Sequence, residues 1–253
     1  MTELTMIVPD LQVPLHDEGF VQKLIDAAKS LSPDRLAFAG DLTDSTEVGR
    51  WVKGKAGEYS GQLKAAFGRT RDIVSGFRDA VGDDCEMLLV DSNHDGRTRT
   101  YVEENAPALA PFLDDELDFA KLVGLRDNGV QFVRGPHRIT PDTVLVHGHE
   151  RLKSSNPAYI AARFMAEYGA NVVAGHTHRP DLTIDAVGVG EDRVVRWSMN
   201  VGHGMDMAKA SYLTDGYAKW SQAFGLLDWD GEVTHPQLVL ALNGKFVMGD
   251  RAW

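Results

Sequence analysis

The sequence predicts an α/β protein whose strands end in polar residues. Apolar runs at residues 4–8 and 36–40 flank an amphipathic segment at 20–28, which is the pattern of a strand–helix–strand unit. Such a unit makes its two strands parallel. The runs lead to Asp10 and Asp41. Because ligands of open α/β sheets gather at the carboxyl ends of parallel strands, the two aspartates indicate a site at that edge.

The rest of the chain alternates between helical and extended patterns. Helices are expected at residues 51–81 with a loop at 53–61, at 97–125 in two or three pieces broken at Pro107 and Pro111, and at 157–168. Strands are expected at 86–90, 131–134, 143–146 and 172–174, followed by a meander at 181–201, 222–228 and 237–242. Because no repeat or linker interrupts this order, we expect residues 1–253 to form a single domain.

The composition restricts the class of protein. With 253 residues, 43% of them hydrophobic and 25% charged, the chain has the composition of a soluble globular protein. No apolar run approaches a membrane span and the N-terminus lacks signal-peptide features, so no membrane partner is expected. The single cysteine, Cys85, excludes an internal disulfide framework and favours a cytoplasmic location. The net charge of −11 argues against an extended nucleic-acid surface, and nothing indicates the oligomeric state.

Polar blocks follow the apolar strands at five places. In chain order they are Asp10-Leu-Gln12, Gly40-Asp41-x-x-Asp44, Asn93-His94-Asp95, His147-x-His149 and Gly175-His176-x-His178. Residues two apart on an extended segment point to the same side, so the two histidines of the last block can face one object. Mixed oxygen and imidazole donors without thiolate suit Mn, Fe, Zn or Co. Because the candidate ligands exceed the needs of one four-coordinate ion, we predict a pair of ions that shares a carboxylate.

The blocks resemble, in order, the motif series DxH, GDxxD, GNH(D/E), H and GHxH of the calcineurin-like metallophosphoesterases. The resemblance implies a four-layer α/β/β/α sandwich in which two mixed sheets are flanked by helices. It also implies a metal-dependent phosphoric ester hydrolase with two divalent ions, manganese being favoured and iron, zinc, cobalt, nickel or magnesium also possible. By position, one ion would be held by Asp10, Gln12, Asp41 and His178, and the other by Asp41, Asn93, His147 and His176.

Two positions depart from the motif series. Gln12 replaces an imidazole by an amide, whose oxygen is a weaker and harder donor, so we expect looser binding there and a preference for manganese over zinc. Alternatively, Gln12 only hydrogen-bonds a metal-bound water. Ser92 stands in place of a glycine and leaves Asn93 and His94 where the motif needs them.

Other residues are candidates for catalysis or substrate contact. The resemblance implies that His94 faces the substrate without binding metal, with Asp95 hydrogen-bonded to it, and that Asn93 also lies at the substrate. Arg97 is favoured over Arg99 and Lys153 as a cation that offsets substrate charge.

Three further polar residues have open roles. His149 either reaches the phosphate or is a polar loop residue, and we favour the loop. His203 follows a later strand and is a further candidate for substrate contact. Asp44 is expected to orient a ligand or to cap the following helix, since Asp44 to Glu47 resembles a capping box.

The expected reaction is in-line attack on phosphorus by a metal-bridging hydroxide, with His94 protonating the leaving oxygen. Few basic residues lie near the blocks, which favours singly charged phosphodiesters, such as cyclic nucleotides, over monoesters. A phosphomonoesterase, a protein phosphatase or a dinucleoside polyphosphate hydrolase is the alternative. A non-catalytic scaffold on the same fold is the alternative from another class, and the loss of a histidine at Gln12 supports it.

Overall fold

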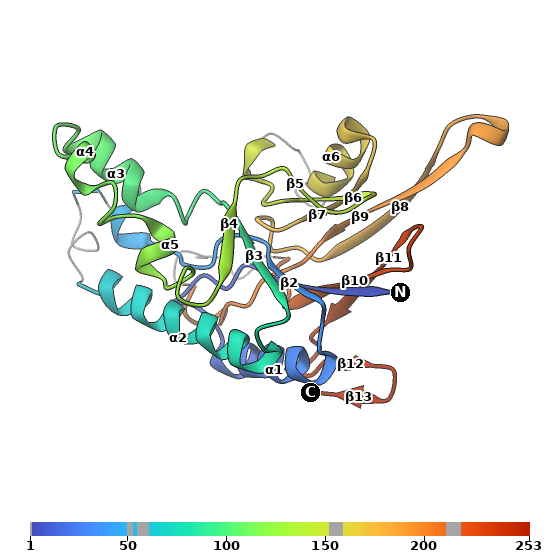
Figure 1. The fold of residues 1–253 in the computed structure, drawn as a ribbon, viewed down its shortest axis with the longest axis horizontal. Coiled ribbons are helices and arrows are strands. Elements are labelled where there is room, and N and C mark those ends of the chain that lie inside the picture. Colours follow the sequence, from blue (N-terminus) through green and yellow to red (C-terminus); the bar gives the residue numbers. More distant parts are fainter. Residues whose placement is uncertain (1, 50–52, 55–60, 152–158, 211–218) are drawn as a thin grey trace.

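The computed structural model describes residues 2–49, 53–54, 61–151, 159–210 and 219–253. Two mixed β-sheets lie against each other, with helices on their outer faces (Figure 1). The first sheet contains β1 (Glu3–Val8), β2 (Arg35–Phe38), β3 (Glu86–Val90), β4 (Val130–Val133), β10 (Ala223–Trp229) and β11 (Thr234–Leu240). The second contains β5 (His137–Thr140), β6 (Thr143–Val146), β7 (Asn171–Ala174), β8 (Asp181–Val187) and β9 (Val194–Asn200).

Both sheets have a parallel centre. The strand orders are β11-β10-β1-β2-β3-β4 and β5-β6-β7-β9-β8, and a separate two-stranded sheet pairs β12 (Val247–Met248) with β13 (Arg251–Ala252). Strands β1 to β4 are parallel in the first sheet, as are β6, β7 and β9 in the second. Strands β10, β11, β5 and β8 pair antiparallel to their neighbours. The carboxyl ends of the parallel strands therefore meet at one edge of each sheet.

Helices make up the outer layers and the connections. They are α1 (Glu18–Leu31), α2 (Leu63–Val81), α3 (Arg97–Asn105), α4 (Ala110–Leu113), α5 (Phe119–Leu122) and α6 (Ile160–Tyr168), with short 3-10 turns at Thr46–Val48, His149–Arg151 and Gly190–Asp192. Asp17 caps α1 by accepting a hydrogen bond from the Phe20 amide at 3.1 Å. Within the described part of the chain, no helix combines the length and apolarity that a membrane span requires.

Three apolar cores separate four layers. The first lies between the first sheet and helices α1 and α2, the second between the two sheets, and the third between the second sheet and α6. Strand β1 shows why the cores divide in this way, since Met6 and Val8 point into the first core and Ile7 into the second. A strand that is buried on both faces has a continuous run of apolar residues in its sequence. The structure thus confirms the four-layer α/β/β/α sandwich.

The carboxylate of Asp142, just before β6, ties the two sheets together. It accepts hydrogen bonds from the Thr143 hydroxyl at 2.9 Å and the Asn171 amide at 2.9 Å, both in the second sheet. From β11 of the first sheet, the backbone amide and the hydroxyl of Thr234 also donate to it. These hydrogen bonds outweigh burial, which alone would raise the pKa of Asp142, and they hold this pKa below its ordinary value.

Three expectations about elements differ from the structure. The expected meander is divided, because β8 and β9 belong to the second sheet whereas β10 and β11 belong to the first. Strand β5 was not predicted, because it is a short edge strand with two of its four residues buried. Pro111 does not break a helix but lies in the first turn of α4, where its missing amide hydrogen is tolerated. The predicted helical residues 51–52 and 157–158 and most of the predicted loop lie outside the described residues.

Candidate metal centre

The predicted ligands come together where the parallel strands end. Asp10 follows β1, Asp41 follows β2 and Asn93 follows β3, while His147 follows β6 and both His176 and His178 follow β7. Backbone hydrogen bonds join these segments, for example from the Gly175 amide to the His147 carbonyl at 3.0 Å. The site therefore spans the edges of both sheets.

Asp41 belongs to two groups of candidate metal ligands. One group is Asp41, His147 and His176, and the other is Asp10, Asp41 and His178; within each group one ligand atom per residue lies within 4.8 Å of the others. The shared residue is the carboxylate that the motif series places between two ions.

His147 presents one nitrogen to this centre. Its Nδ1 donates to the Ala39 carbonyl at 2.8 Å, which leaves Nε2 to face Asp41 Oδ1 at 3.1 Å and Asn93 Oδ1 at 3.2 Å. Burial would lower the pKa of His147, but Asp41 outweighs burial and raises it to about 10, while the pKa of Asp41 lies well below its ordinary value. A backbone carbonyl that fixes the second nitrogen is the usual arrangement for a ligating histidine.

The second group is buried around Asp10. Asp10 Oδ2 lies 3.2 Å from His178 Nε2 and accepts from the His176 amide at 2.7 Å, whereas its buried Oδ1 has no hydrogen-bond partner among the described residues. Burial raises the pKa of Asp10 well above its ordinary value. Burial also lowers the pKa of His176 to about 3 and that of His178 to about 4, so both imidazoles are neutral at pH 7. Neutral imidazoles and an unpartnered carboxylate oxygen fit a divalent cation.

Gln12 lies against the shared carboxylate. Its Nε2 donates to Asp41 Oδ2 at 2.8 Å and lies 3.5 Å from His178 Nε2, and its buried Oε1 has no hydrogen-bond partner in the part of the chain that the structure describes. The side chain is thus at the position of the missing imidazole, with a carboxamide oxygen available to a cation.

Four of the candidate ligands have left-handed backbone conformations. The φ angles are 55° at Gln12, 46° at Asp41, 66° at His176 and 57° at His178. Each such residue costs about 1–3 kcal/mol and persists only where the surrounding structure enforces it, which is common at functional sites. The motif spacing alone gave no sign of this strain.

Two glycines allow the close approach of these segments. At Gly40, where φ is +94°, a Cβ atom would lie 2.5 Å from His147 Nδ1 and 2.9 Å from Ser92 Cβ. At Gly175 a Cβ atom would overlap Asp10 Oδ1 and lie 2.9 Å from the Ala39 carbonyl oxygen. Both positions therefore need a residue without a side chain.

His94 lies beside the candidate ligands and is held by Asp44. Its Nδ1 is 2.9 Å from the Asp44 carbonyl oxygen and 3.2 Å from Asp44 Oδ1, and its Nε2 is 3.8 Å from Asp41 Oδ2. Burial would lower the pKa of His94, but Asp41 and Asp44 outweigh burial and raise it above its ordinary value. Arg97 Nη2 lies 2.7 Å from His94 Nε2, and its Nη1 donates to the Asp44 carbonyl at 2.7 Å. With Arg97 in this position, Nε2 accepts a hydrogen bond and the imidazole is neutral, with its proton on Nδ1.

The carboxylate that pairs with His94 corrects an expectation. Asp95 was expected to hold His94, but its buried carboxylate accepts from the Ser92 hydroxyl at 2.8 Å and from the Thr43 amide at 3.2 Å. Burial raises the pKa of Asp95 to about 7. Asp44, separated from His94 by 50 residues, is the carboxylate that pairs with His94. The expected capping box is not formed, because the residue at the N-cap of the 3-10 turn is Ser45.

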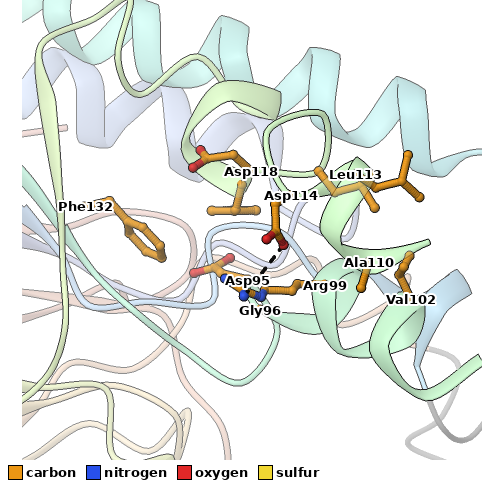
Figure 2. Close-up of a pocket in the computed structure, with 11 residues that line it drawn as sticks. Asp95, Gly96, Arg99, Val102, Ala110, Leu113, Asp114, Asp118 and Phe132 are labelled. Carbon is orange, nitrogen blue, oxygen red and sulfur yellow. Dashed lines mark ion pairs between the residues drawn. The ribbon is translucent and has the colours of Figure 1, made fainter. Parts of the chain in front are cut away.

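Asp95 and Arg99 line a different cavity. This cavity has a volume of about 150 Å³. Figure 2 shows its lining from α3, α4 and α5 and from Phe132 of β4, with Arg99 pointing toward Asp114. The two charged groups lie 3.7 Å apart, and Arg99 also donates to Glu103 at 2.8 Å. Arg99 therefore belongs to a surface ion-pair group, whereas Arg97 faces the candidate ligands. Lys153 lies outside the described residues.

A larger cavity of about 600 Å³ opens over the candidate ligands. Its lining residues are Gln12, Asp41, Asp44, Thr46, Gly49, His94, Arg97, His176, His178 and Trp220. Trp220, whose ring centroid lies 4.3 Å from that of His178, was not predicted, because no motif surrounds it in the sequence. It lies shortly before β10, outside the elements that the sequence predicts.

Two predicted substrate contacts lie elsewhere. His203 is fully buried; its Nδ1 accepts from the Met205 amide at 2.9 Å, and its ring lies 5.4 Å from the ring of His178. It thus packs behind a candidate ligand and does not line the large cavity. The ring of His149 lies 5.4 Å from that of His147, and its Nδ1 lies 3.8 Å from Glu150 Oε2. His149 is also not one of the described residues that line the cavity.

Comparison with known proteins gives relatives over the whole length. The gene 54 protein of Mycobacterium phage L5 is 30% identical over 259 residues, which cover 100% of this chain and 99% of the relative. The chain belongs to the family of these gene 54 proteins. A second member, the gene 54 protein of Mycobacterium phage D29, is also 30% identical, with 100% of this chain and 99% of the relative covered. No family model matches the sequence.

Solved structures also align with this member of the gene 54 family. Vps29 from Entamoeba histolytica, complexed with Zn²⁺, is 13% identical with a TM-score of 0.47, and 96% of each chain is covered. The phosphoesterase YfcE from E. coli is 17% identical with a TM-score of 0.39, covering 90% of this chain and 89% of that chain. The nuclease MPE from Pseudomonas putida is 13% identical with a TM-score of 0.32, covering 92% of this chain and 87% of that chain.

Proposed function

We propose that this chain is a dinuclear metal-dependent phosphoesterase that hydrolyses small nucleotide-type phosphodiesters. The observation that carries the proposal is that Asp41 belongs to both groups of candidate ligands, while His94 lies 3.8 Å from it and outside both groups. A carboxylate shared between two sets of donors suits two divalent ions. Oxygen and imidazole donors without thiolate suit Mn, Fe, Zn or Co, and the amide oxygen of Gln12 in place of an imidazole favours manganese over zinc.

The proposed ligands divide into two sets that share Asp41. One ion would be held by Asp10, Gln12, Asp41 and His178, and the other by Asp41, Asn93, His147 and His176. When bound, the two ions would supply an activated water for in-line attack and would neutralise charge on the phosphoryl oxygens. The neutral state of His176 and His178, which burial enforces, prepares them to bind a cation.

His94 and Arg97 act on the substrate in this proposal. Asp44 fixes the His94 ring through Nδ1, so that Nε2 faces the cavity beside Asp41. Arg97 covers Nε2 at 2.7 Å and must move before that nitrogen can donate a proton. When a phosphoryl oxygen attracts the Arg97 guanidinium away, His94 Nε2 takes up a proton from solvent, because Asp41 and Asp44 raise the pKa of His94. The imidazolium then donates this proton to the leaving oxygen. Entry of the substrate would thereby convert His94 from an acceptor into a general acid.

The cavity supports a small diester as the substrate. Its volume of about 600 Å³ lies within the range of small-molecule sites. Arg97 is the single Lys or Arg among the described lining residues, and a diester, with one negative charge, needs fewer cations than a monoester.

A non-catalytic scaffold is the second candidate function, and Gln12 favours it. The Gln12 amide donates to Asp41 at 2.8 Å, so this hydrogen bond stabilises the carboxylate without a cation. In a scaffold, the hydrogen bond between Gln12 and Asp41 would persist and the site would bind no metal.

Hydrolysis of two chromogenic esters distinguishes these functions. The purified chain, freed of metal and titrated with Mn²⁺, would be assayed on bis(4-nitrophenyl) phosphate and on 4-nitrophenyl phosphate, with Asp41→Asn as the matched variant. The proposal expects Mn²⁺-dependent turnover that is faster for the diester and lost in Asp41→Asn. Faster monoester cleavage would overturn the diester preference. Failure both to bind Mn²⁺ and to cleave either ester would establish the scaffold.

A further inference from the structure

Trp220 forms an aromatic wall at the candidate metal centre. Its ring centroid lies 4.3 Å from that of His178 with an interplanar angle of 78°, and 6.1 Å from that of His203. The near-perpendicular rings of Trp220 and His178 form a corner, and both residues line the large cavity. A planar group against the Trp220 ring would therefore lie next to a candidate metal ligand.

The backbone fixes Trp220 relative to that ligand. The amide of Ser221, the next residue, donates to the His178 carbonyl at 3.1 Å, and the Ser221 carbonyl accepts from the His203 amide at 3.3 Å. The side chain of Gln222 donates to Asp17 at 3.0 Å and to the Met205 carbonyl at 3.1 Å. The backbone that follows Trp220 is thus held by contacts to the segments of His178, His203 and Met205, so little backbone ordering is needed when a ligand binds.

Another part of the cavity lining has a different chemistry. His94 and Arg97 belong to it, linked to each other at 2.7 Å and to Asp44. The leaving oxygen lies beside His94 in the proposed mechanism, because His94 is the general acid. The part of the ester that stays on phosphorus is then left to the rest of the lining, where Trp220 presents the one indole ring among the described lining residues.

We propose that Trp220 is the platform for the nucleobase of the substrate, on the part of the ester that remains attached to phosphorus. The inference rests on the proposed function and names the substrate class for the same site. Every nucleobase has a flat π-face, and base–aromatic stacking contributes about tenfold or more to affinity. Stacking needs no added cation, which agrees with a chain whose net charge is −11. Trp220 is therefore a specificity-determining residue, and an alkyl phosphoester lacks the group that it binds.

Two phosphate compounds that differ in the base test this inference. Adenosine 5′-monophosphate and ribose 5-phosphate carry the same phosphate on the same sugar, so the ratio of their affinities isolates the base. Binding of each to the Mn²⁺-loaded full chain would be measured by calorimetry. Their inhibition of diester hydrolysis would be measured in parallel.

The variants are Trp220→Ala and Trp220→Phe, with Trp229→Phe at the far end of β10 as the matched control. The wild type and Trp229→Phe are expected to bind the nucleotide about tenfold or more tightly than the sugar phosphate. Trp220→Ala is expected to reduce this ratio to about one while the affinity for ribose 5-phosphate stays unchanged, and Trp220→Phe to retain part of the ratio.

Two results would overturn the inference. One is equal binding of the two compounds by the wild type, including no binding of either. The other is an equal loss of affinity for both compounds in Trp220→Ala, which would show a structural role alone. Mn²⁺-dependent ester hydrolysis by the same protein would show that the proposed function survives such a failure. Conversely, base-selective binding that depends on Trp220, without any hydrolysis, would support the platform and overturn the catalytic function.

Discussion

The Nδ1 atom of His94 lies 3.2 Å from a carboxylate oxygen of Asp44 and 2.9 Å from the carbonyl oxygen of the same residue. One residue thus fixes the orientation of the imidazole through two oxygens. His94 is in neither group of candidate metal ligands, although it lies 3.8 Å from Asp41, which is in both. The structure separates the residue proposed to move a proton from those proposed to hold metal.

His94→Ala is predicted to keep its metal and to lose most turnover. Removal of a general acid lowers kcat by about 10²–10⁴-fold. Asp44→Asn keeps the His94 ring but weakens the contact that orients it. The kcat of this variant is expected to lie between those of His94→Ala and the wild type. Mn²⁺ content measured beside steady-state rates tests both variants. An unchanged kcat in His94→Ala would refute the assignment, as would loss of Mn²⁺ in parallel with activity.

Gln12→His is predicted to tighten the binding of one metal ion. The variant restores the imidazole of the motif series next to Asp41 and His178, where the Gln12 amide now lies 2.8 Å and 3.5 Å from them. The expected gain in affinity for Zn²⁺ is about tenfold or more, since changes of this kind near metal sites have effects of 10–100-fold. Gln12→Ala is the comparison and is expected to weaken the binding of the same ion. Competition titration with a chelating dye measures the affinity of each variant for Zn²⁺. Equal affinities in the wild type, Gln12→His and Gln12→Ala would exclude Gln12 from the metal centre.

Asp142→Asn is predicted to destabilise the fold at pH 7 and to have little effect in acid. The folded-state pKa of Asp142 is lowered, so its stabilising contribution is present above the unfolded pKa of about 3.9 and is lost as pH falls through the folded pKa. Loss of hydrogen bonds to a charged acceptor costs about 1–3 kcal/mol. Urea unfolding of the wild type, Asp142→Asn and the exposed-site control Asp79→Asn at several pH values measures the difference. A difference that stays constant from pH 7 to pH 3 would contradict this account.

The sequence predicted the parts of the site that lie directly after strands. An apolar run followed by a ligand-type residue identified Asp10, Asp41, His147 and the final histidine pair, because parallel strands bring their carboxyl ends to one edge. The four layers were implied by the resemblance to the motif series, and the continuous apolar runs agree with strands that are buried on both faces. The resemblance also implied which residues of the blocks meet.

Other parts of the site depend on backbone geometry that no spacing reports. Asp95 adjoins His94 in sequence, yet Asp44 is the residue whose carboxylate lies 3.2 Å from the His94 ring, in a segment where Asp41 and Ser45 have left-handed backbone conformations. Trp220 reaches the cavity through hydrogen bonds of Ser221 to segments distant in sequence. His203 resembled a substrate contact, but it packs behind His178. These relationships come from tertiary structure rather than from local pattern.

The position of manganese in the loaded protein decides whether Asp41 is shared by two ions. Anomalous diffraction from crystals grown with Mn²⁺ would locate each ion without assuming an activity. The account predicts two peaks about 3.5–4 Å apart, with Asp41 between them, one beside His147 and His176 and the other beside Asp10 and His178. A single peak, or peaks that do not share Asp41, would contradict the dinuclear centre.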